Sequence, residues 1–329
     1  MIVSVVAMPE GVVTHTDLPQ ARERLARSDF LLVDIELPDD EVPVEPPLAR
    51  QLGLESEHLV WFGRPGEPTR ADFLGDRAGF VVPVVDGTRV THFHALATEQ
   101  HVITVHRGRI GLMDSLKVRL GFERPSDAVA MLFLLLQEAL ETFRRAAVAD
   151  LLLVEELEDE MFDRRRPEQV YRLAQLRRRS ALFHHSLLPY LQVTDEILTR
   201  RMLSRDFPEA RQRLARQFRH ASRLSLTDIE TLQEAARRTF ASYTSLVSGE
   251  QNGVINRLAI VSTIFLPLSF LTGYFGMNFT YMTDELESKF VFWLLAVGLQ
   301  LGVLFIALYV LHRTKLWRRL RDSDVTQDR

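Results

Sequence analysis

Two long apolar runs near the C-terminus constrain this chain more than any other feature of its sequence. Neither Leu258–Phe275 nor Phe290–Leu311 contains a charged residue. A helix needs about 20 mostly apolar residues to cross a bilayer. A pair of buried core helices would still need a polar face, for which the second run offers only Gln300. We therefore predict a transmembrane hairpin with spans at about 254–275 and 290–311.

The distribution of charge predicts how this hairpin is oriented. Basic residues lie on its outer flanks: Arg237, Arg238, Arg257, Arg313, Lys315, Arg318, Arg319 and Arg321. The connecting loop 276–289 instead carries Asp284, Glu285 and Glu287 against Lys289. Basic flanks stay on the cytoplasmic side. We therefore expect a multi-pass protein of the inner (plasma) membrane with both termini in the cytoplasm, a short periplasmic loop and a basic cytoplasmic tail at 313–329.

The N-terminal part of the chain has the pattern of a soluble α/β domain. Short runs rich in β-branched residues are separated by turn signals such as Asp86-Gly87. The runs are Ile2–Ala7, Phe30–Leu37, Gly79–Val85, Val90–Ala95 and His101–His106. A helical stretch is expected at Leu48–Leu59. These features predict a cytoplasmic α/β domain over residues 1–125.

Long helices are predicted from residue 126 onward. Ser126-Asp127 offers an N-terminal cap, and Pro167 and Pro208 stand where new helices begin. We expect helices from Ser126 to about Arg164, from Glu168 to about Arg205, and from Pro208 without a break to Phe275. Residues 126–251 are thus predicted to form long cytoplasmic helices and a stalk that continues into the hairpin at 252–312. The fold class is an α+β membrane protein.

Composition argues against several classes of function. The chain has no cysteine, which removes disulfides, thiolate metal sites and thiol chemistry. A net charge of −4, without a basic strip interleaved with aromatic residues, gives no support for nucleic-acid binding. No glycine-rich phosphate loop, catalytic carboxylate pair or nucleophile–base pattern occurs in the sequence. We therefore expect neither an enzyme nor a resident cofactor.

One face of the first span is a candidate pore lining. Two spans enclose no pore, so transport would require several copies of the chain around an axis. Amide, hydroxyl, small and apolar side chains recur along this face at spacings of three and four: Asn252, Ile255, Ala259, Ser262, Leu266, Ser269, Gly273 and Gly276. Small residues with this spacing serve close helix packing equally well, so both interpretations stay open.

The expected lining is neutral, which bears on how an ion would pass. Mg²⁺ gives up its water reluctantly, whereas a site that strips a dication would need several fixed carboxylates. Neutral oxygens suit an ion that keeps its water shell. Rings of Leu258 or Leu266 would gate such a pore by dewetting. Asp284, Glu285 and Glu287 would concentrate cations at the outer mouth.

The segment Asn256–Phe279, with Gly276-Met277-Asn278 near its end, resembles the first transmembrane helix and signature of CorA-type divalent metal ion transporters. The resemblance implies a funnel-shaped homopentamer with a long helical stalk, in which the first span lines the pore. It also implies that Gly276, Met277 and Asn278 form the outer entrance. There Asn278 would hold a hydrated cation by its carboxamide oxygen. Tyr281–Leu286 resembles the acidic loop of the family, although Thr283 and Asp284 replace its proline.

Three functions remain open at this point. The first is passive uptake of Mg²⁺, or of Co²⁺ or Ni²⁺, as hydrated ions through a pentameric pore in membrane lipid. The run Leu266–Gly273 is at least as close to the zinc-transporting ZntB branch, so proton-coupled Zn²⁺ uptake is the second. A weakly conducting membrane-anchored scaffold or sensor is the third.

Family members gated by magnesium carry carboxylates on the stalk. This stalk departs from that pattern. Ala241 stands where the resemblance leads us to expect a neck aspartate. The stalk also carries arginines instead of carboxylates: Arg211, Arg213, Arg216, Arg219 and Arg223. We therefore do not expect ion sensing by that route.

Two weaker patterns have ordinary alternatives. His92 and His94 alternate on one strand and His101 and His106 on the next, which suggests either an imidazole metal site or solvent-facing histidines. The acidic run Glu155–Asp163 would hold cations at a helix tip or, more commonly, form a solvated helix end.

Overall fold

The structure is a computed structural model that describes residues 1–8, 10–27, 30–40, 42–54, 57–74, 77–202, 208–277, 288, 290 and 293–313. Contacts divide the chain into two compact units, Met1–Phe240 and Ala241–Arg329. The domain boundaries expected from the sequence stay predictions, since the division falls inside the third long helix.

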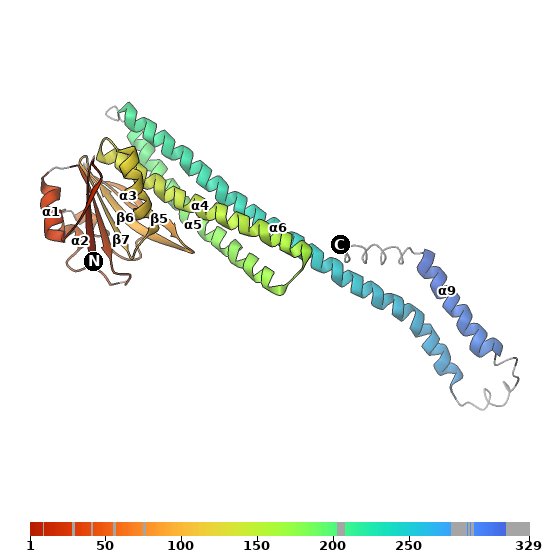
Figure 1. The fold of residues 1–329 in the computed structure, drawn as a ribbon. Coiled ribbons are helices and arrows are strands. Elements are labelled where there is room, and N and C mark those ends of the chain that lie inside the picture. The colour runs from red at the N-terminus through yellow and green to blue at the C-terminus, as the bar shows by residue number, and fades with distance from the viewer. Residues whose placement is uncertain are drawn as a thin grey trace. The chain divides into compact units, whose positions relative to one another are not determined.

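A seven-stranded sheet forms the centre of the first unit, in the order β2-β1-β3-β7-β6-β5-β4 (Figure 1). Its strands are β1 (Ile2–Ala7), β2 (Val12–Thr16), β3 (Leu31–Leu37), β4 (Arg70–Leu74), β5 (Arg77–Asp86), β6 (Arg89–Ala97) and β7 (His101–Arg107). All neighbouring strands are antiparallel except β3 and β7. The β5–β6 hairpin turns at Gly87, whose φ of 58° favours glycine. The turn predicted at Asp86-Gly87 is therefore confirmed.

Helices cover both faces of this sheet (Figure 1). On one face, α1 (Leu18–Ala26), α2 (Leu48–Gln51) and a short 3₁₀ turn at Glu57–Leu59 enclose an apolar core with residues of β1, β3 and β7. On the other face lie α3 (Gly111–Glu123) and α4 (Ala128–Asp163). Coverage on both sides explains why β3 is buried along nearly its whole length, although it carries Asp34 and Glu36.

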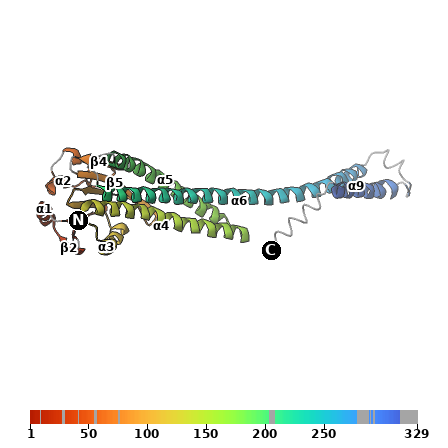
Figure 2. The ribbon, with the colours of Figure 1, turned by 90° about the horizontal axis from the view of Figure 1, so that it is seen from above.

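Helices α4, α5 (Pro167–Met202) and the first part of α6 (Glu209–Phe275) run alongside one another in the first unit (Figures 1 and 2). The Asp127 side chain caps α4 by accepting a hydrogen bond from the Ala130 amide at 2.7 Å. Edge-to-face aromatic contacts join the helices, including Phe143–Phe183 and Tyr190–Phe218. The starts predicted for these helices and the unbroken course of α6 are confirmed.

Some predicted elements differ from the structure. The helix expected at Leu48–Leu59 is wrong in extent, because Gly53 takes a φ of 73° and ends α2 after one turn. Elements β2, β4, α1 and α3 were not predicted. The last residues expected for the second long helix, 203–205, lie outside the described residues.

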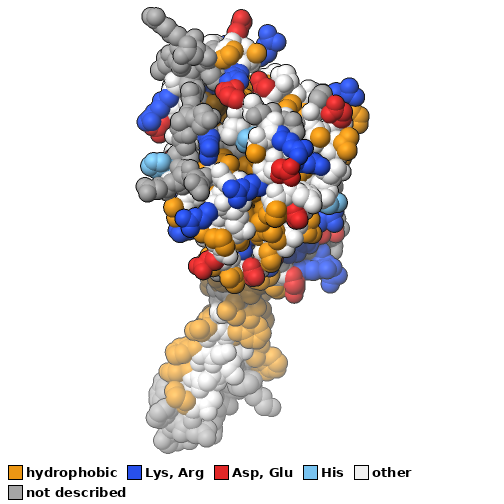
Figure 3. Space-filling view, turned by 90° about the vertical axis from the view of Figure 1, so that its left-hand side faces the viewer, with side chains coloured by type: hydrophobic (Ala, Val, Ile, Leu, Met, Phe, Trp, Pro, Cys, Tyr) orange, Lys and Arg blue, Asp and Glu red, His pale blue; other side chains and the backbone are white. Residues whose placement is uncertain are grey.

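The second unit is dominated by exposed apolar side chains. It contains α6 from Ala241 onward, a π-helical turn at Trp293–Gly298 and α9 (Leu299–Arg313). Among the described helices, α6 is long and apolar enough to cross a membrane, and α9 is a shorter apolar helix. Figure 3 shows charged side chains spread over the first unit, whereas the visible described part of the second unit is largely hydrophobic. Such a surface exceeds what a soluble monomer normally exposes.

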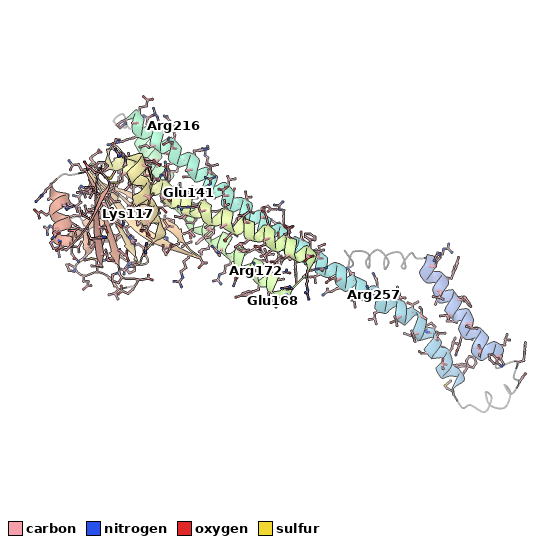
Figure 4. All side chains as sticks on the ribbon, viewed as in Figure 1. Lys117, Glu141, Glu168, Arg172, Arg216 and Arg257 are labelled. Carbon is pink, nitrogen blue, oxygen red and sulfur yellow. The ribbon has the colours of Figure 1, made fainter. Side chains whose placement is uncertain are left out.

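A buried charged cluster fastens the parallel pair β3–β7 to α3. The Asp34 carboxylate accepts hydrogen bonds from Thr104 Oγ1 at 2.8 Å and from Lys117 Nζ at 3.1 Å, and it lies 3.2 Å from His106 Nε2. Figure 4 labels Lys117 on α3. The side chains of Asp34 and His106 are 5% and 3% exposed. Because the carboxylate is buried, its partners are what make its charge tolerable.

The cluster shifts the pKa values of both buried groups. Burial by itself would raise the pKa of Asp34, but the hydrogen bond and charge of His106, together with Lys117 and Thr104, lower it below its usual value. Burial would lower the pKa of His106, but its hydrogen bond to Asp34 and the carboxylate charge raise it. The charged forms of both groups therefore stabilise the folded state.

Replacing Asp34 tests this cluster. We expect Asp34→Asn to destabilise the first unit by about 3–5 kcal/mol, because it leaves the Lys117 ammonium without its buried counter-charge. Thermal unfolding of the full chain in detergent measures the change. Asp114→Asn is the matched control, because Asp114 pairs with Arg109 on the exposed surface and should change little. Equal effects of the two substitutions would contradict the importance of the cluster.

The pKa of His106 also predicts a pH dependence. Because the pKa of His106 is raised in the folded state, its protonated form stabilises that state. This contribution to stability is fully present below the pKa of the unfolded state, which is about 6.5, and is lost as the pH rises through the pKa of the folded state. As the pH rises from about 6.5 through the raised pKa of the folded state, the wild type should lose stability from this source. The His106→Gln variant should show a flatter profile. The control His185→Gln, at an exposed histidine, should leave the change of stability with pH as it is in the wild type. The same change of stability with pH in all three proteins would refute the role assigned to His106.

Candidate ion pathway

The predicted pore-lining residues all lie on one exposed face of α6. In the isolated chain each of them is exposed: Asn252, Ile255, Leu258, Ala259, Ser262, Leu266, Ser269 and Gly273. Less exposed residues recur on the opposite side of the helix, at Ile260, Ile264, Leu268, Leu271 and Phe275. A helix that buries one side within its own hairpin leaves the other side for neighbours or for water. The lining role of the exposed side stays a prediction.

The hydroxyl groups of this segment differ in how they are satisfied. Thr263 Oγ1 and Thr272 Oγ1 donate to the carbonyl oxygens of Ala259 and Leu268, each at 2.7 Å. Within the described part of the chain, the side chains of Ser262 and Ser269 form no hydrogen bond. The two serine hydroxyls on the candidate face therefore remain available to water, while the threonine hydroxyls are used by the helix itself.

Helix α6 ends at the Gly276-Met277 turn. The Gly276 amide donates to the Thr272 carbonyl at 3.0 Å, and the Met277 amide donates to the Tyr274 carbonyl at 3.3 Å. A Cβ atom at Gly276 would lie 3.1 Å from the Thr272 carbonyl oxygen, so a side chain at this position would press on the last turn of the helix. The described Met277 side chain is 40% exposed.

Several predicted site residues fall outside the described part of the chain. Asn278, the predicted ligand of a hydrated ion, is the first of them, and the acidic loop residues Asp284, Glu285 and Glu287 follow. The basic tail beyond Arg313 is also outside. Their roles stay predictions.

The arginines at the start of α6 are partly used within the chain. Arg211 pairs with Glu99 at 2.7 Å, and Arg219 pairs with Asp195 at 2.6 Å. Arg213, Arg216 and Arg223 have no ion pair among the described residues, and Figure 4 shows Arg216 extending from the helix surface. A stretch with this charge repels a dication. It does not resemble a site at which a metal ion would be sensed.

The strand histidines serve other purposes than metal binding. His94 accepts a hydrogen bond from the Gly63 amide at 3.0 Å and stacks on Trp61. Burial, followed by the nearby charges of His92 and Arg107, lowers the pKa of His94 to about 4. His106 belongs to the Asp34 cluster. No group of three metal-ligating side chains forms among the described residues. The alternative of solvent-facing histidines holds for the exposed His92 but is wrong for His94 and His106, which are buried.

The acidic run at the end of α4 is engaged in local hydrogen bonds. Thr239 Oγ1 donates to Glu158 at 3.0 Å, and Arg172 lies 3.5 Å from Glu160. These contacts are those of a solvated, partly paired helix end, which was the commoner of the two interpretations.

One contact of the hairpin was not predicted. Gln300 Nε2 on α9 donates a hydrogen bond to Thr272 Oγ1 on α6 at 3.2 Å. The sequence signal for it was the single strongly polar side chain in the second apolar run. Periodicity along one helix cannot say which residue of another helix such a side chain will meet.

Comparisons with known proteins agree with this architecture. The chain is 32% identical over 170 residues to the cobalt/magnesium transport protein CorA of Thermotoga maritima, a match that covers 50% of this chain and 45% of that protein. The chain thus spans less than half the length of this relative.

Two solved structures share the fold. The complete CorA magnesium transporter from Methanocaldococcus jannaschii matches with a TM-score of 0.74 at 19% identity, over 95% of this chain and 98% of that one. The ZntB cytoplasmic domain from Vibrio parahaemolyticus matches with a TM-score of 0.51 at 10% identity, over 76% of this chain and 98% of that one. Likeness at such low identity speaks for the fold alone.

A family model decides the relationship. The model described as CorA-like Mg²⁺ transporter protein matches residues 28–313, which include strands β3 to β7, the long helices and both apolar runs. The signature resemblance noted around Gly276 is thereby extended to nearly the whole sequence, and the chain belongs to the family of CorA-like Mg²⁺ transporter proteins.

Proposed function

We propose that this protein transports divalent cations across the plasma membrane, most simply as a passive channel for Mg²⁺. The observation that carries the proposal is the uncharged, exposed face of α6, which presents amide and hydroxyl groups at Asn252, Ser262 and Ser269. Membership of the CorA-like family supports it. Co²⁺ and Ni²⁺ are further candidate substrates.

Neutral oxygen donors suit an ion that moves with its water shell. Mg²⁺ gives up its water reluctantly, so a ring of carboxamide and hydroxyl groups would bind the hydrated ion weakly enough to release it. In this proposal Asn278, directly after the Gly276-Met277 turn, holds the hydrated ion at the outer entrance. The acidic residues Asp284, Glu285 and Glu287 raise the local cation concentration there.

A pore of this kind requires several copies of the chain. The two apolar segments of one chain enclose no channel, and the exposed apolar surface of the second unit needs lipid or neighbouring copies to cover it. We propose a homopentamer with five copies of α6 around the axis, as the family resemblance implies. Both termini would lie in the cytoplasm, as the basic flanks indicate.

The membrane potential supplies enough energy for uptake. Each positive charge gains about 2.3 kcal/mol per 100 mV, so a dication moving inward needs no nucleotide hydrolysis. In this proposal the first unit acts as a cytoplasmic support or regulator.

Zinc uptake is the second candidate. The run Leu266–Gly273 is similar to the ZntB branch of the family, and the first unit shares its fold with a ZntB cytoplasmic domain. In that case uptake would be coupled to protons. Flux into proteoliposomes with Mg²⁺, Co²⁺, Ni²⁺ or Zn²⁺, each with and without a pH gradient, separates the two candidates.

Replacing Asn278 tests the entrance. We expect Asn278→Ala to lower Mg²⁺ flux into proteoliposomes by about tenfold, the effect of losing hydrogen bonds worth about 1.4 kcal/mol. Asn256→Ala is the matched control, because Asn256 carries the same amide on α6 but lies away from the candidate face. Its flux should equal that of the wild type.

The outcomes of this experiment are distinct. Equal flux in Asn278→Ala and wild type would remove Asn278 from the entrance. Equal losses in both asparagine variants would point to a general effect on the helix. Absence of flux for every cation, in wild type and variants alike, would favour the weakly conducting membrane-anchored scaffold or sensor over a transporter.

Sensing of cytoplasmic Mg²⁺ is expected to be weak. The start of α6 presents arginines where carboxylates would be needed, and Arg213, Arg216 and Arg223 lack carboxylate partners among the described residues. Low millimolar Mg²⁺ should therefore give little protection against limited proteolysis of the purified full-length protein. Strong protection under these conditions would show that the protein binds Mg²⁺ at a cytoplasmic site elsewhere.

A further inference from the structure

Gln300 is the single strongly polar side chain within the second apolar run. Its Nε2 donates to Thr272 Oγ1 at 3.2 Å, which joins α9 to the last turns of α6 within the second unit. A carboxamide in hydrocarbon is costly unless it finds a partner, so intramembrane polar groups are retained where they have a function. This contact therefore satisfies the carboxamide and joins the two helices at one defined position.

Thr272 links this contact to the end of α6. Its hydroxyl donates to the Leu268 carbonyl at 2.7 Å, and its own carbonyl accepts the hydrogen bond from the Gly276 amide at 3.0 Å. The Gly276 Cα is so close to this carbonyl that an added Cβ would lie 3.1 Å from the oxygen. Any movement of Thr272 is therefore passed on to Gly276 directly.

The backbone of α6 is weakened shortly before this end of the helix. Pro267 lies inside the helix and has no amide hydrogen, so the backbone hydrogen bond to the carbonyl four residues earlier is missing. Helices bend at such positions. The segment from Leu268 to Phe275 thus follows a position with one backbone hydrogen bond fewer, and the bond from Gln300 joins this segment to α9.

We infer that Gln300 is a positioning residue that holds the Gly276-Met277 turn in place through its hydrogen bond to Thr272. This inference rests on the proposed function in one respect, namely that the turn forms the entrance of an ion pathway. The geometric part does not depend on transport. Gln300 contacts Thr272, which is not one of the candidate pore-lining residues, and acts through the Thr272 hydroxyl on the last turns of α6.

Hydrogen exchange at the turn tests the geometric part. We expect Gln300→Leu and the nearly isosteric Thr272→Val each to speed exchange of the peptide containing Gly276 and Met277, measured by mass spectrometry on the full-length protein in lipid nanodiscs. The loss of one interhelical hydrogen bond in a membrane should raise the exchange rate by about threefold on average. The double variant should exchange no faster than either single variant, because both substitutions break the same bond.

Two further variants separate this role from a general loss of packing. Thr272→Ser keeps the hydroxyl and should restore wild-type exchange. Thr263→Val is the matched control, because the Thr263 hydroxyl makes the same bond within α6, to Ala259 at 2.7 Å, without a partner on α9. It should leave exchange at the turn unchanged. Equal exchange at Gly276 in wild type, Gln300→Leu and Thr272→Val would overturn the inference.

Mg²⁺ flux of the same variants tests the functional consequence. A loss of flux in Gln300→Leu and Thr272→Val that is restored in Thr272→Ser would connect the turn to transport. If the wild type carries no Mg²⁺ while exchange responds as expected, the proposed function fails and the positioning role stands. If the wild type carries Mg²⁺ and exchange is the same in all variants, the positioning role fails and the proposed function stands.

Discussion

The continuity of α6 is the constraint on which the rest of the structure depends. This helix runs unbroken for 67 residues from Glu209 to Phe275. In the first unit it buries Ala215, Phe218 and Ile229, whereas beyond Ala241 it exposes large apolar side chains. A backbone that leaves water for hydrocarbon must satisfy its own polar groups, which a helix does and a loop does not. The same element can therefore belong to both environments.

Much of the fold follows from local signals in the sequence, and the parts that do not have identifiable reasons. Pro167, Pro208 and the Asp127 cap marked where the long helices begin, because these residues act on the backbone next to them. Helix α3 went unpredicted because it starts at Gly111 without a side-chain cap and its apolar residues show almost no helical asymmetry. The edge strand β2 is short and mostly exposed, so its pattern is weak. Gly53 ends α2 after one turn, although the composition of Leu48–Leu59 favoured a longer helix.

The candidate site divides in the same way. Spacing along one helix sufficed to propose the face that contains Ser262 and Ser269, since helical periodicity is a property of the segment itself. The partner of Gln300 could not be predicted, because pairing between two helices depends on how they pack. The Asp34 cluster was missed for a related reason. Its members come from β3, β7 and α3, and only the register of the parallel strands brings Asp34 opposite Thr104.

The division of contacts at residue 240 also orders events during biosynthesis. Strand β3 must wait for β7, which is made some 70 residues later, before the sheet can close. Even so, every residue of the first unit is synthesised before the apolar part of α6 begins. Domains tend to fold as units during synthesis, N-terminal first. The water-exposed unit can thus complete its core before the hydrophobic segment at Leu258–Phe275 recruits the insertion machinery, and the two halves of one helix acquire their environments at different times.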